Sequence, residues 1–356
     1  MCLSAPEYVP YRGAGRHRKG EYEMTKAERI RAALRGERPD RVPYALWSHF
    51  PGIDMDPEKL AEESWSFYKK LDIDLIKTMN NGMYPIEDLG CEVDYSEIRK
   101  GGVAKLVSTP VHQVSDWDKI PVCDPGKGAL ARELHSLELL LEMRDKAGDD
   151  VPVIFTCFSP LTIADKVSGK HWQEHIDQGG ISQIKAALDR ITETTCALVR
   201  RATEMGADGI FFASQMSNYD VTTAERYREL GVPYDVQVIQ SSRGWFNVLH
   251  AHGNDIMFEL LKDYPVQVFN WHVGESLPEM DECALLTGKC LMGGLQRADI
   301  TNRNHNAVHN QIFRALKATD GKGLILTPGC VIRYPLDEEM LASVRKTKEE
   351  VEGKLF

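Results

Sequence analysis

The sequence predicts an α/β fold, a closed (β/α)8 TIM barrel in a single domain. Three observations predict it: short apolar runs recur along the chain, helical stretches stand between them, and no long linker interrupts the alternation. Apolar runs that alternate with helices indicate parallel strands covered on their outer side. The regular spacing favours one closed barrel over two open-sheet domains.

The expected elements begin after Met24. Thr25 is a candidate N-cap, the apolar spacing that follows it is helical, and Gly36 ends the segment. Strands are then expected at 42–47, 73–79, 152–158, 206–214, 246–253, 266–274, 290–295 and 323–330. The helices expected between them include 130–147, 181–204, 256–262 and 306–318.

Two segments depart from this rhythm. Residues 92–110 alternate on both sides of Lys100-Gly101-Gly102, which predicts a β-hairpin inserted into the barrel. Residues 1–23 are basic and contain glycine, and are expected to be an extension before a barrel of residues 24–356. They lack the apolar segment of a secretory signal peptide, so a cytoplasmic location is expected.

Composition narrows the class of partner. The formal net charge of −10 argues against nucleic acid and against an anionic membrane surface, and favours a small molecule or another protein. No apolar run approaches the roughly 18 residues of a membrane helix. The eight cysteines are scattered without a Cys-x-x-Cys pair, which favours reduced thiols over a disulfide framework.

Barrel enzymes carry their chemistry at the carboxyl ends of the strands, and polar residues gather there in this sequence. Some of them are expected only to cap loops and helices. The set is Lys77, Thr78, Asn80, Ser159, Ser214, Gln215, Asn218, His250, His252, Asn270, His272, Gln296 and Cys330.

One interpretation of these polar residues at the strand ends is a metal site. On a strand, His250 and His252 point to the same side about 7 Å apart, and barrel closure brings Cys330 toward them. Two imidazoles and a thiolate suit zinc, with one position left open. His272 is a possible fourth ligand, or a group that faces the substrate, and Glu275 is a weaker candidate. A hydrogen-bonded histidine pair and an inert cysteine remain the alternative.

Six stretches of the chain resemble the uroporphyrinogen decarboxylase superfamily. They include MTKAERIRAALRGERPDRVPYALW, YRELGVPYDVQVIQSSRGWFNVLHAHGN and LILTPGCVIRYPLDEEMLASV, and the resemblance extends over nearly the whole chain from Met24. It implies a (β/α)8 barrel with its active site at the carboxyl mouth.

The sequence departs from true uroporphyrinogen decarboxylases. Their arginine-rich segment corresponds to ALWSHFPG, which contains no arginine to bind a polycarboxylate substrate. Their aspartate corresponds to Asp74, their tyrosine falls near Lys166, and their late histidine is replaced by Cys330. Decarboxylation in the haem pathway is therefore not expected.

The zinc-dependent corrinoid methyltransferases are the more similar branch. They carry a His-x-Cys-Gly motif and a Pro-Gly-Cys motif, and this chain has His-Ala-His-Gly at 250–253 and Pro-Gly-Cys at 328–330. The resemblance implies a Zn²⁺ site of His250, His252 and Cys330. With histidine replacing one cysteine, the site is less negative and a stronger Lewis acid.

The resemblance implies methyl transfer between a protein-bound cobalamin and a small thiol or tetrahydropterin-type acceptor, which zinc activates. The corrinoid would be a methyl-carrying co-substrate on a separate carrier protein, and no residue is assigned to it. Asp74, Asn218 and His272 are expected to position the substrate. Two alternatives stay open: a metal-free decarboxylase-like lyase, and an accessory protein that binds a corrinoid or tetrapyrrole.

Overall fold

The computed structural model describes residues 23–97 and 104–356, which form a curled sheet of seven parallel strands. The strand order is β1-β4-β5-β6-β7-β8-β9, so within this sheet each strand pairs with the sheet's next strand along the chain. The strands are β1 Ile76–Lys77, β4 Val153–Phe158, β5 Gly209–Ser214, β6 Val248–Ala251, β7 Val268–Trp271, β8 Cys290–Leu295 and β9 Leu324–Pro328. Every residue of these strands is buried, as expected for a parallel sheet covered on both faces.

The segment expected as a strand at 42–47 closes the barrel between β9 and β1. Ala45 N donates to Leu326 O at 3.1 Å, and Asp74 N donates to Tyr44 O at 2.8 Å. Tyr44 pairs with Leu326 through an isolated parallel bridge and not through a continuous ladder. The predicted barrel is confirmed, with this extended segment in the eighth strand position.

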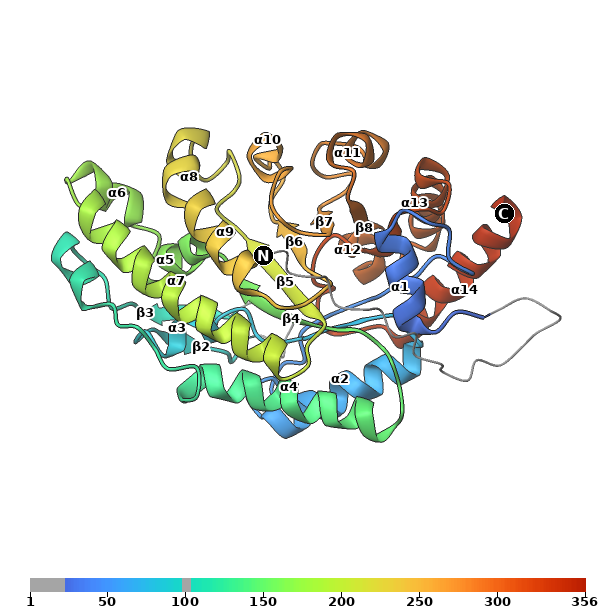
Figure 1. Ribbon diagram of the computed structural model, residues 1–356, viewed down its shortest axis with the longest axis horizontal. Helices are drawn as coiled ribbons and strands as arrows, with labels where there is room; N and C mark the ends of the chain where they lie inside the picture. Colours follow the sequence, from blue (N-terminus) through green and yellow to red (C-terminus); the bar gives the residue numbers. More distant parts are fainter. Residues whose placement is uncertain (1–22, 98–103) are drawn as a thin grey trace, which may run out of the picture.

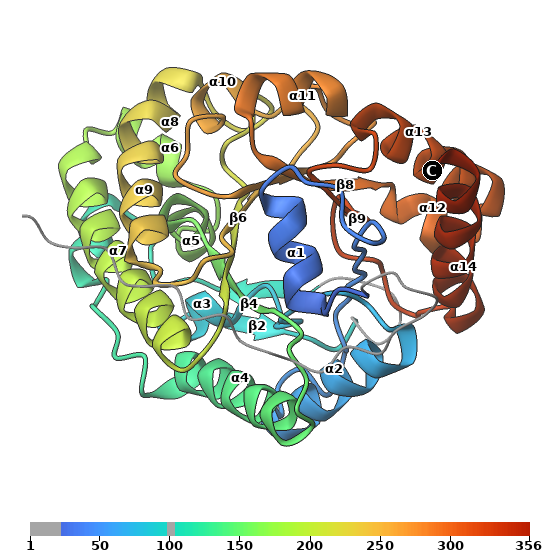
Figure 2. The ribbon, with the colours of Figure 1, turned by 45° about the vertical axis from the view of Figure 1, so that its right-hand side comes forward.

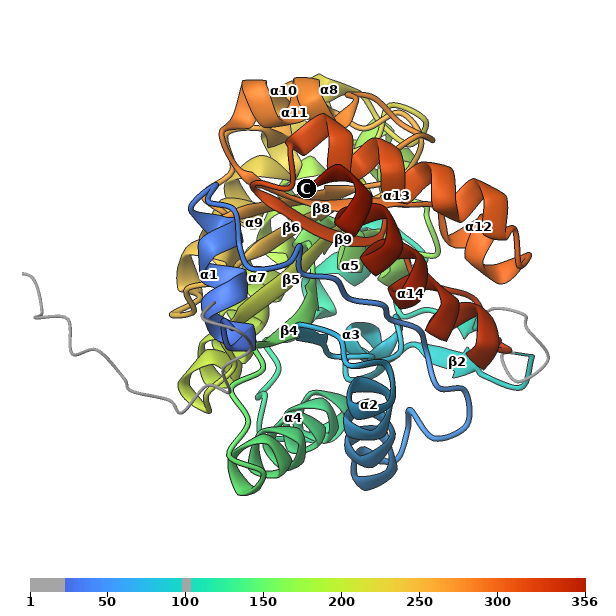
Figure 3. The same ribbon diagram turned by 90° about the vertical axis from the view of Figure 1, so that its right-hand side faces the viewer.

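Helices surround the strands as a ring, and α1 lies across one end of the barrel (Figures 1 and 2). That end is the amino-terminal one, because Lys26 Nζ in α1 donates to Ile73 O just before β1. Figure 3 shows α13 and α14 side by side on the outer wall. The helices are α1 Lys26–Leu34, α2 Pro57–Leu71, α3 Tyr84–Glu87, α4 Gly128–Lys146, α5 Pro160–Val167, α6 Trp172–Asp177, α7 Ile181–Glu204, α8 Ala224–Leu230, α9 Val232–Ser241, α10 Phe258–Leu261, α11 Met280–Thr287, α12 Arg297–Thr301, α13 His305–Thr319 and α14 Glu338–Leu355.

Local sequence signals explain several boundaries. The Thr25 side chain accepts from Glu28 N at the start of α1, and Glu28 Oε2 accepts from Thr25 N, which is a capping box. The predicted end at Gly36 is confirmed by its positive φ of 70°. The helix expected at 256–262 is shorter, because α10 begins only at Phe258.

The two sides of the predicted hairpin pair as expected. β2 (Glu92–Asp94) and β3 (Lys105–Ser108) are antiparallel, whereas the predicted turn at 100–102 lies outside the described residues. Residues 1–22 of the expected extension also lie outside them. The seven cysteines in the described ranges are free thiols. Within those ranges, every helix is too short or too polar to span a bilayer.

Candidate metal centre

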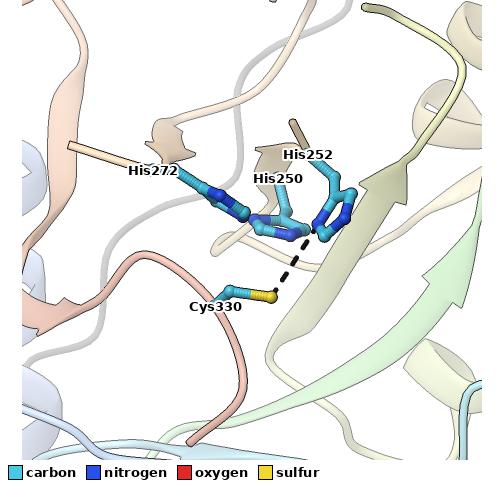
Figure 4. Close-up of side chains that lie close together, drawn as sticks. All are labelled: His250, His252, His272 and Cys330. Carbon is cyan, nitrogen blue, oxygen red and sulfur yellow. Dashed lines mark hydrogen bonds between the residues drawn. The ribbon is translucent and has the colours of Figure 1, made fainter. Parts of the chain in front are cut away.

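Four side chains from the carboxyl ends of three strands meet at one point (Figure 4). His250 lies on β6 and His252 just beyond it, His272 follows β7, and Cys330 follows β9. Each offers one ligand atom, and these atoms all lie within 4.8 Å of one another. The predicted convergence of His250, His252 and Cys330 is present, and His272 joins them.

The environment of His250 fixes which ring nitrogen is available. Asn270 Nδ2 donates to Met292 O at 2.7 Å, so Asn270 Oδ1 is the atom that faces the ring. His250 Nδ1 lies 2.5 Å from that oxygen and must therefore carry the proton. The Nε2 lone pair of His250 is then free to bind a metal ion.

His272 and His252 meet edge to face, with ring centroids 4.8 Å apart. His272 Nε2 is buried and has no hydrogen-bond partner, whereas its Nδ1 lies 3.5 Å from Glu275 Oε2. A buried polar nitrogen without a partner is costly, and a metal ion would satisfy it. His252 is also close to the thiol of the cluster, because its Nδ1 lies 3.8 Å from Cys330 Sγ.

Two glycines allow the backbone to approach closely beside the ligands. Gly253 has a φ of 117°, and a Cβ there would lie 1.6 Å from Asn218 Nδ2. A Cβ on Gly329 would lie 2.6 Å from Trp271 O, next to His272. Asn218, which the sequence analysis expects to position the substrate, lies against this turn, and its Oδ1 accepts from Asp220 N.

Burial sets the protonation of the cluster. Desolvation, followed by the charge of Arg297, lowers the pKa of His272 to about 4. Desolvation, followed by the effects of His272 and Arg297, lowers the pKa of His252 to about 4 as well, and burial also holds the pKa of His250 well below its usual value. Burial raises the pKa of the Cys330 thiol, which Arg297 opposes. Neutral imidazoles are the form that binds metals.

Two cations flank the cluster. Lys77 is 5% exposed at the end of β1, and its Nζ donates to Thr78 O at 3.1 Å and lies 4.9 Å from the Phe211 ring centroid. Arg297 Nη1 donates to Cys330 Sγ at 3.2 Å. Sequence reasoning noted Lys77 but missed Arg297, although Arg297 directly follows Gln296 at the end of β8.

The structure does not bring Asp74 to this cluster. Its carboxylate accepts from Arg29 Nη1 at 2.9 Å, from Arg41 Nη1 at 2.7 Å and from Tyr44 N at 2.9 Å. It precedes β1, at the barrel end that α1 covers. The expectation that Asp74 positions substrate is corrected, because its contacts make it an anchor of barrel closure.

Fold and site together define a class, a parallel α/β barrel with a buried His/Cys set able to hold a transition-metal ion at its carboxyl mouth. The model of the uroporphyrinogen decarboxylase (URO-D) family matches residues 25–351. The chain therefore belongs to this family.

Curated relatives include the methylcobamide:CoM methyltransferase MtbA of Methanosarcina mazei, 23% identical over 65% of this chain and 71% of the relative. The methylcobamide:CoM methyltransferase MtaA of Methanosarcina barkeri is 24% identical over 65% of this chain and 70% of that protein.

Solved structures show the same fold. A methyltransferase from Methanosarcina mazei superposes with a TM-score of 0.79 at 20% identity, covering 92% of this chain and 99% of that one. A B12-independent methionine synthase from Shewanella sp. W3-18-1 gives a TM-score of 0.61 at 16% identity, covering 89% and 96%.

Proposed function

We propose that the protein is a corrinoid-dependent methyltransferase with a zinc centre. The observation that carries the proposal is the convergence of His250, His252, His272 and Cys330 at the barrel mouth. The relatives are named methylcobamide:CoM methyltransferases, which supports this reaction class. Three imidazoles and one thiol are donors that zinc accepts readily.

His250, His252 and Cys330 would hold the ion, and His272 would either complete a tetrahedral set or face the acceptor. Bound zinc would supply the Lewis acidity that makes a nucleophile from the acceptor at neutral pH. The chain's own residues prepare the site: Asn270 orients His250, and Arg297 donates to the Cys330 sulfur. Asn218 supports the turn that carries His252.

The proposed reaction moves a methyl group between a protein-bound cobalamin and a small thiol or tetrahydropterin-type acceptor. The corrinoid arrives as a methyl-carrying co-substrate on a separate carrier protein. Among the described residues, α1 covers the amino-terminal end of the barrel, which leaves the carboxyl mouth as the end that suits such docking.

The test combines metal analysis with methyl transfer from methylcobalamin, followed by the absorbance change of the cobalamin. We expect stoichiometric zinc and transfer to a thiol or a tetrahydropterin in the unaltered protein, and loss of both in His250→Ala and Cys330→Ala. His309→Ala is the matched control, since His309 is exposed on α13.

Three results contradict the proposal. Full methyl transfer without bound metal would overturn the zinc centre, and protein that neither binds zinc nor transfers a methyl group would favour the metal-free, lyase-like alternative. Zinc-loaded protein that moves no methyl group to any acceptor would favour an accessory protein that only binds a corrinoid or tetrapyrrole.

A further inference from the structure

A small hollow lies beside the metal cluster. It is a shallow depression with about 170 Å³ of empty space, open solvent included, and it is lined by His272, Val273, Glu275, Leu295, Arg297, Gly329 and Cys330. It opens directly onto Cys330, the one thiol of the cluster. A ligand bound against this depression would lie beside Cys330 and His272.

Two opposite charges line this hollow without pairing with each other. In the described ranges, no ion pair joins Glu275 to a lysine or arginine, and none joins Arg297 to a carboxylate. The Glu275 carboxylate lies 3.5 Å from His272 Nδ1 and is 35% exposed. The Arg297 side chain has five N–H donors, and within the described part of the chain one of them has an acceptor, the Cys330 sulfur.

Unpaired charges of opposite sign around one small hollow favour a ligand that carries both. A guanidinium binds a carboxylate through two parallel hydrogen bonds, and a carboxylate accepts from an ammonium group. Val273 and the buried Leu295 give the hollow an apolar wall, which suits a short methylene chain between the ligand's charged head and its metal-binding end.

We infer that the methyl acceptor is a zwitterionic thiol of the α-amino-acid class, with its carboxylate at Arg297, its ammonium at Glu275 and its sulfur toward the metal position. This inference rests on the proposed function and names the acceptor for the same site. In the step, the acceptor sulfur loses its proton to solvent and forms a bond to the methyl carbon. The bond from cobalt to that carbon breaks, and the electron pair of that bond stays on cobalt.

The experiment compares acceptors that differ only in their charged head: homocysteine, 3-mercaptopropionate, cysteamine and 2-mercaptoethanol. Zinc-loaded protein and methylcobalamin are used, and kcat/KM is measured for each thiol. A charged hydrogen bond contributes about 1.5–3 kcal/mol, or roughly ten- to a hundredfold. The kcat/KM for homocysteine is expected to exceed that for each of the other three thiols by about tenfold or more.

Two variants assign the charges. Glu275→Gln keeps an acceptor for His272 and is expected to lower the ratio of homocysteine to 3-mercaptopropionate by about tenfold. Arg297→Gln is expected to lower kcat/KM for homocysteine and for 3-mercaptopropionate relative to kcat/KM for 2-mercaptoethanol. Because each ratio compares kcat/KM for two thiols in the same variant, an effect of the substitution on zinc binding cancels. Glu282→Gln on α11 and Arg314→Gln on α13, both exposed, are the matched controls and should leave all ratios unchanged.

A homocysteine ratio that Glu275→Gln leaves unchanged, or a preference for a thiol with one charge or none, overturns the inference while methyl transfer itself stands. If no thiol is methylated, calorimetry of homocysteine and 3-mercaptopropionate with zinc-loaded protein still decides. Tighter binding of homocysteine, lost in Glu275→Gln, supports the zwitterion site, and equal binding contradicts it.

Discussion

Asn270 holds His250 through a 2.5 Å contact between Asn270 Oδ1 and His250 Nδ1, on neighbouring strands β7 and β6. The pair lies in register, and the amide is itself fixed by its bond to Met292 O. The orientation of one metal donor is therefore built into the sheet.

Replacing this amide tests its role. Asn270→Leu leaves a buried Nδ1–H without an acceptor and frees the ring to adopt the other tautomer. Loss of such a supporting contact typically costs about 10–100-fold in metal affinity. We expect that loss in a competition assay with a zinc chelator. Asn310→Leu on the exposed side of α13 is the control, and equal affinity in the two variants would contradict the assigned role.

Zinc binding should release one proton near pH 7. The pKa values of His252 and His272 lie at about 4 and that of His250 is lower than usual, so the imidazoles are already unprotonated. The Cys330 thiol has a raised pKa and must lose its proton to bind. Affinity should therefore rise about tenfold per pH unit from pH 6 to 8. Calorimetry in buffers of different ionisation enthalpy counts the protons, and a count of zero or two would refute this assignment.

Elements were predictable from sequence where their apolar pattern is unbroken. The expected segments 181–204 and 290–295 coincide with α7 and β8. The convergence of His250, His252 and Cys330 was predictable because the two histidines lie at the end of one strand and Cys330 follows the end of another. The position of Arg297 beside the cluster was not predictable, because an arginine at the start of a helix is usually a surface residue.

The direction of a polar side chain at a strand end could not be predicted. Ala213 is the register partner of His250, so Ser214 points to the opposite side of the sheet. Its hydroxyl lies 2.7 Å from Tyr227 Oη on α8, away from the cluster. Pairing register decides this, and one sequence without a known register cannot supply it.

Asp74 should matter for stability and not for zinc. Asp74→Asn removes the charge that Arg29 and Arg41 share, and Arg29 has a side-chain exposure of only 3%. Breaking a buried pair costs about 3–5 kcal/mol, here lessened because Asp40 still pairs with Arg29. We expect a lower free energy of unfolding in denaturant with zinc content unchanged in the folded protein. Unchanged stability with lost activity would return Asp74 to a catalytic role.

A second buried carboxyl gives the stability of the barrel a pH dependence. Asp235 on α9 accepts from Tyr227 and from Tyr264, and burial raises its pKa to about 6. The folded protein therefore holds this proton more tightly than the unfolded chain, in which the aspartate has its ordinary pKa of 3.8. The resulting stabilisation is fully present below the unfolded pKa and is lost as pH rises through about 6.

Asp235→Asn cannot lose this proton and keeps a carbonyl acceptor for one tyrosine. Each pKa unit corresponds to about 1.4 kcal/mol, so the free-energy difference between the two proteins should change by a few kcal/mol between pH 4 and 7. The variant gains relative to the unaltered protein as pH rises. Urea unfolding across this range measures the difference, and parallel curves for the two proteins would show that Asp235 keeps an ordinary pKa in the folded barrel.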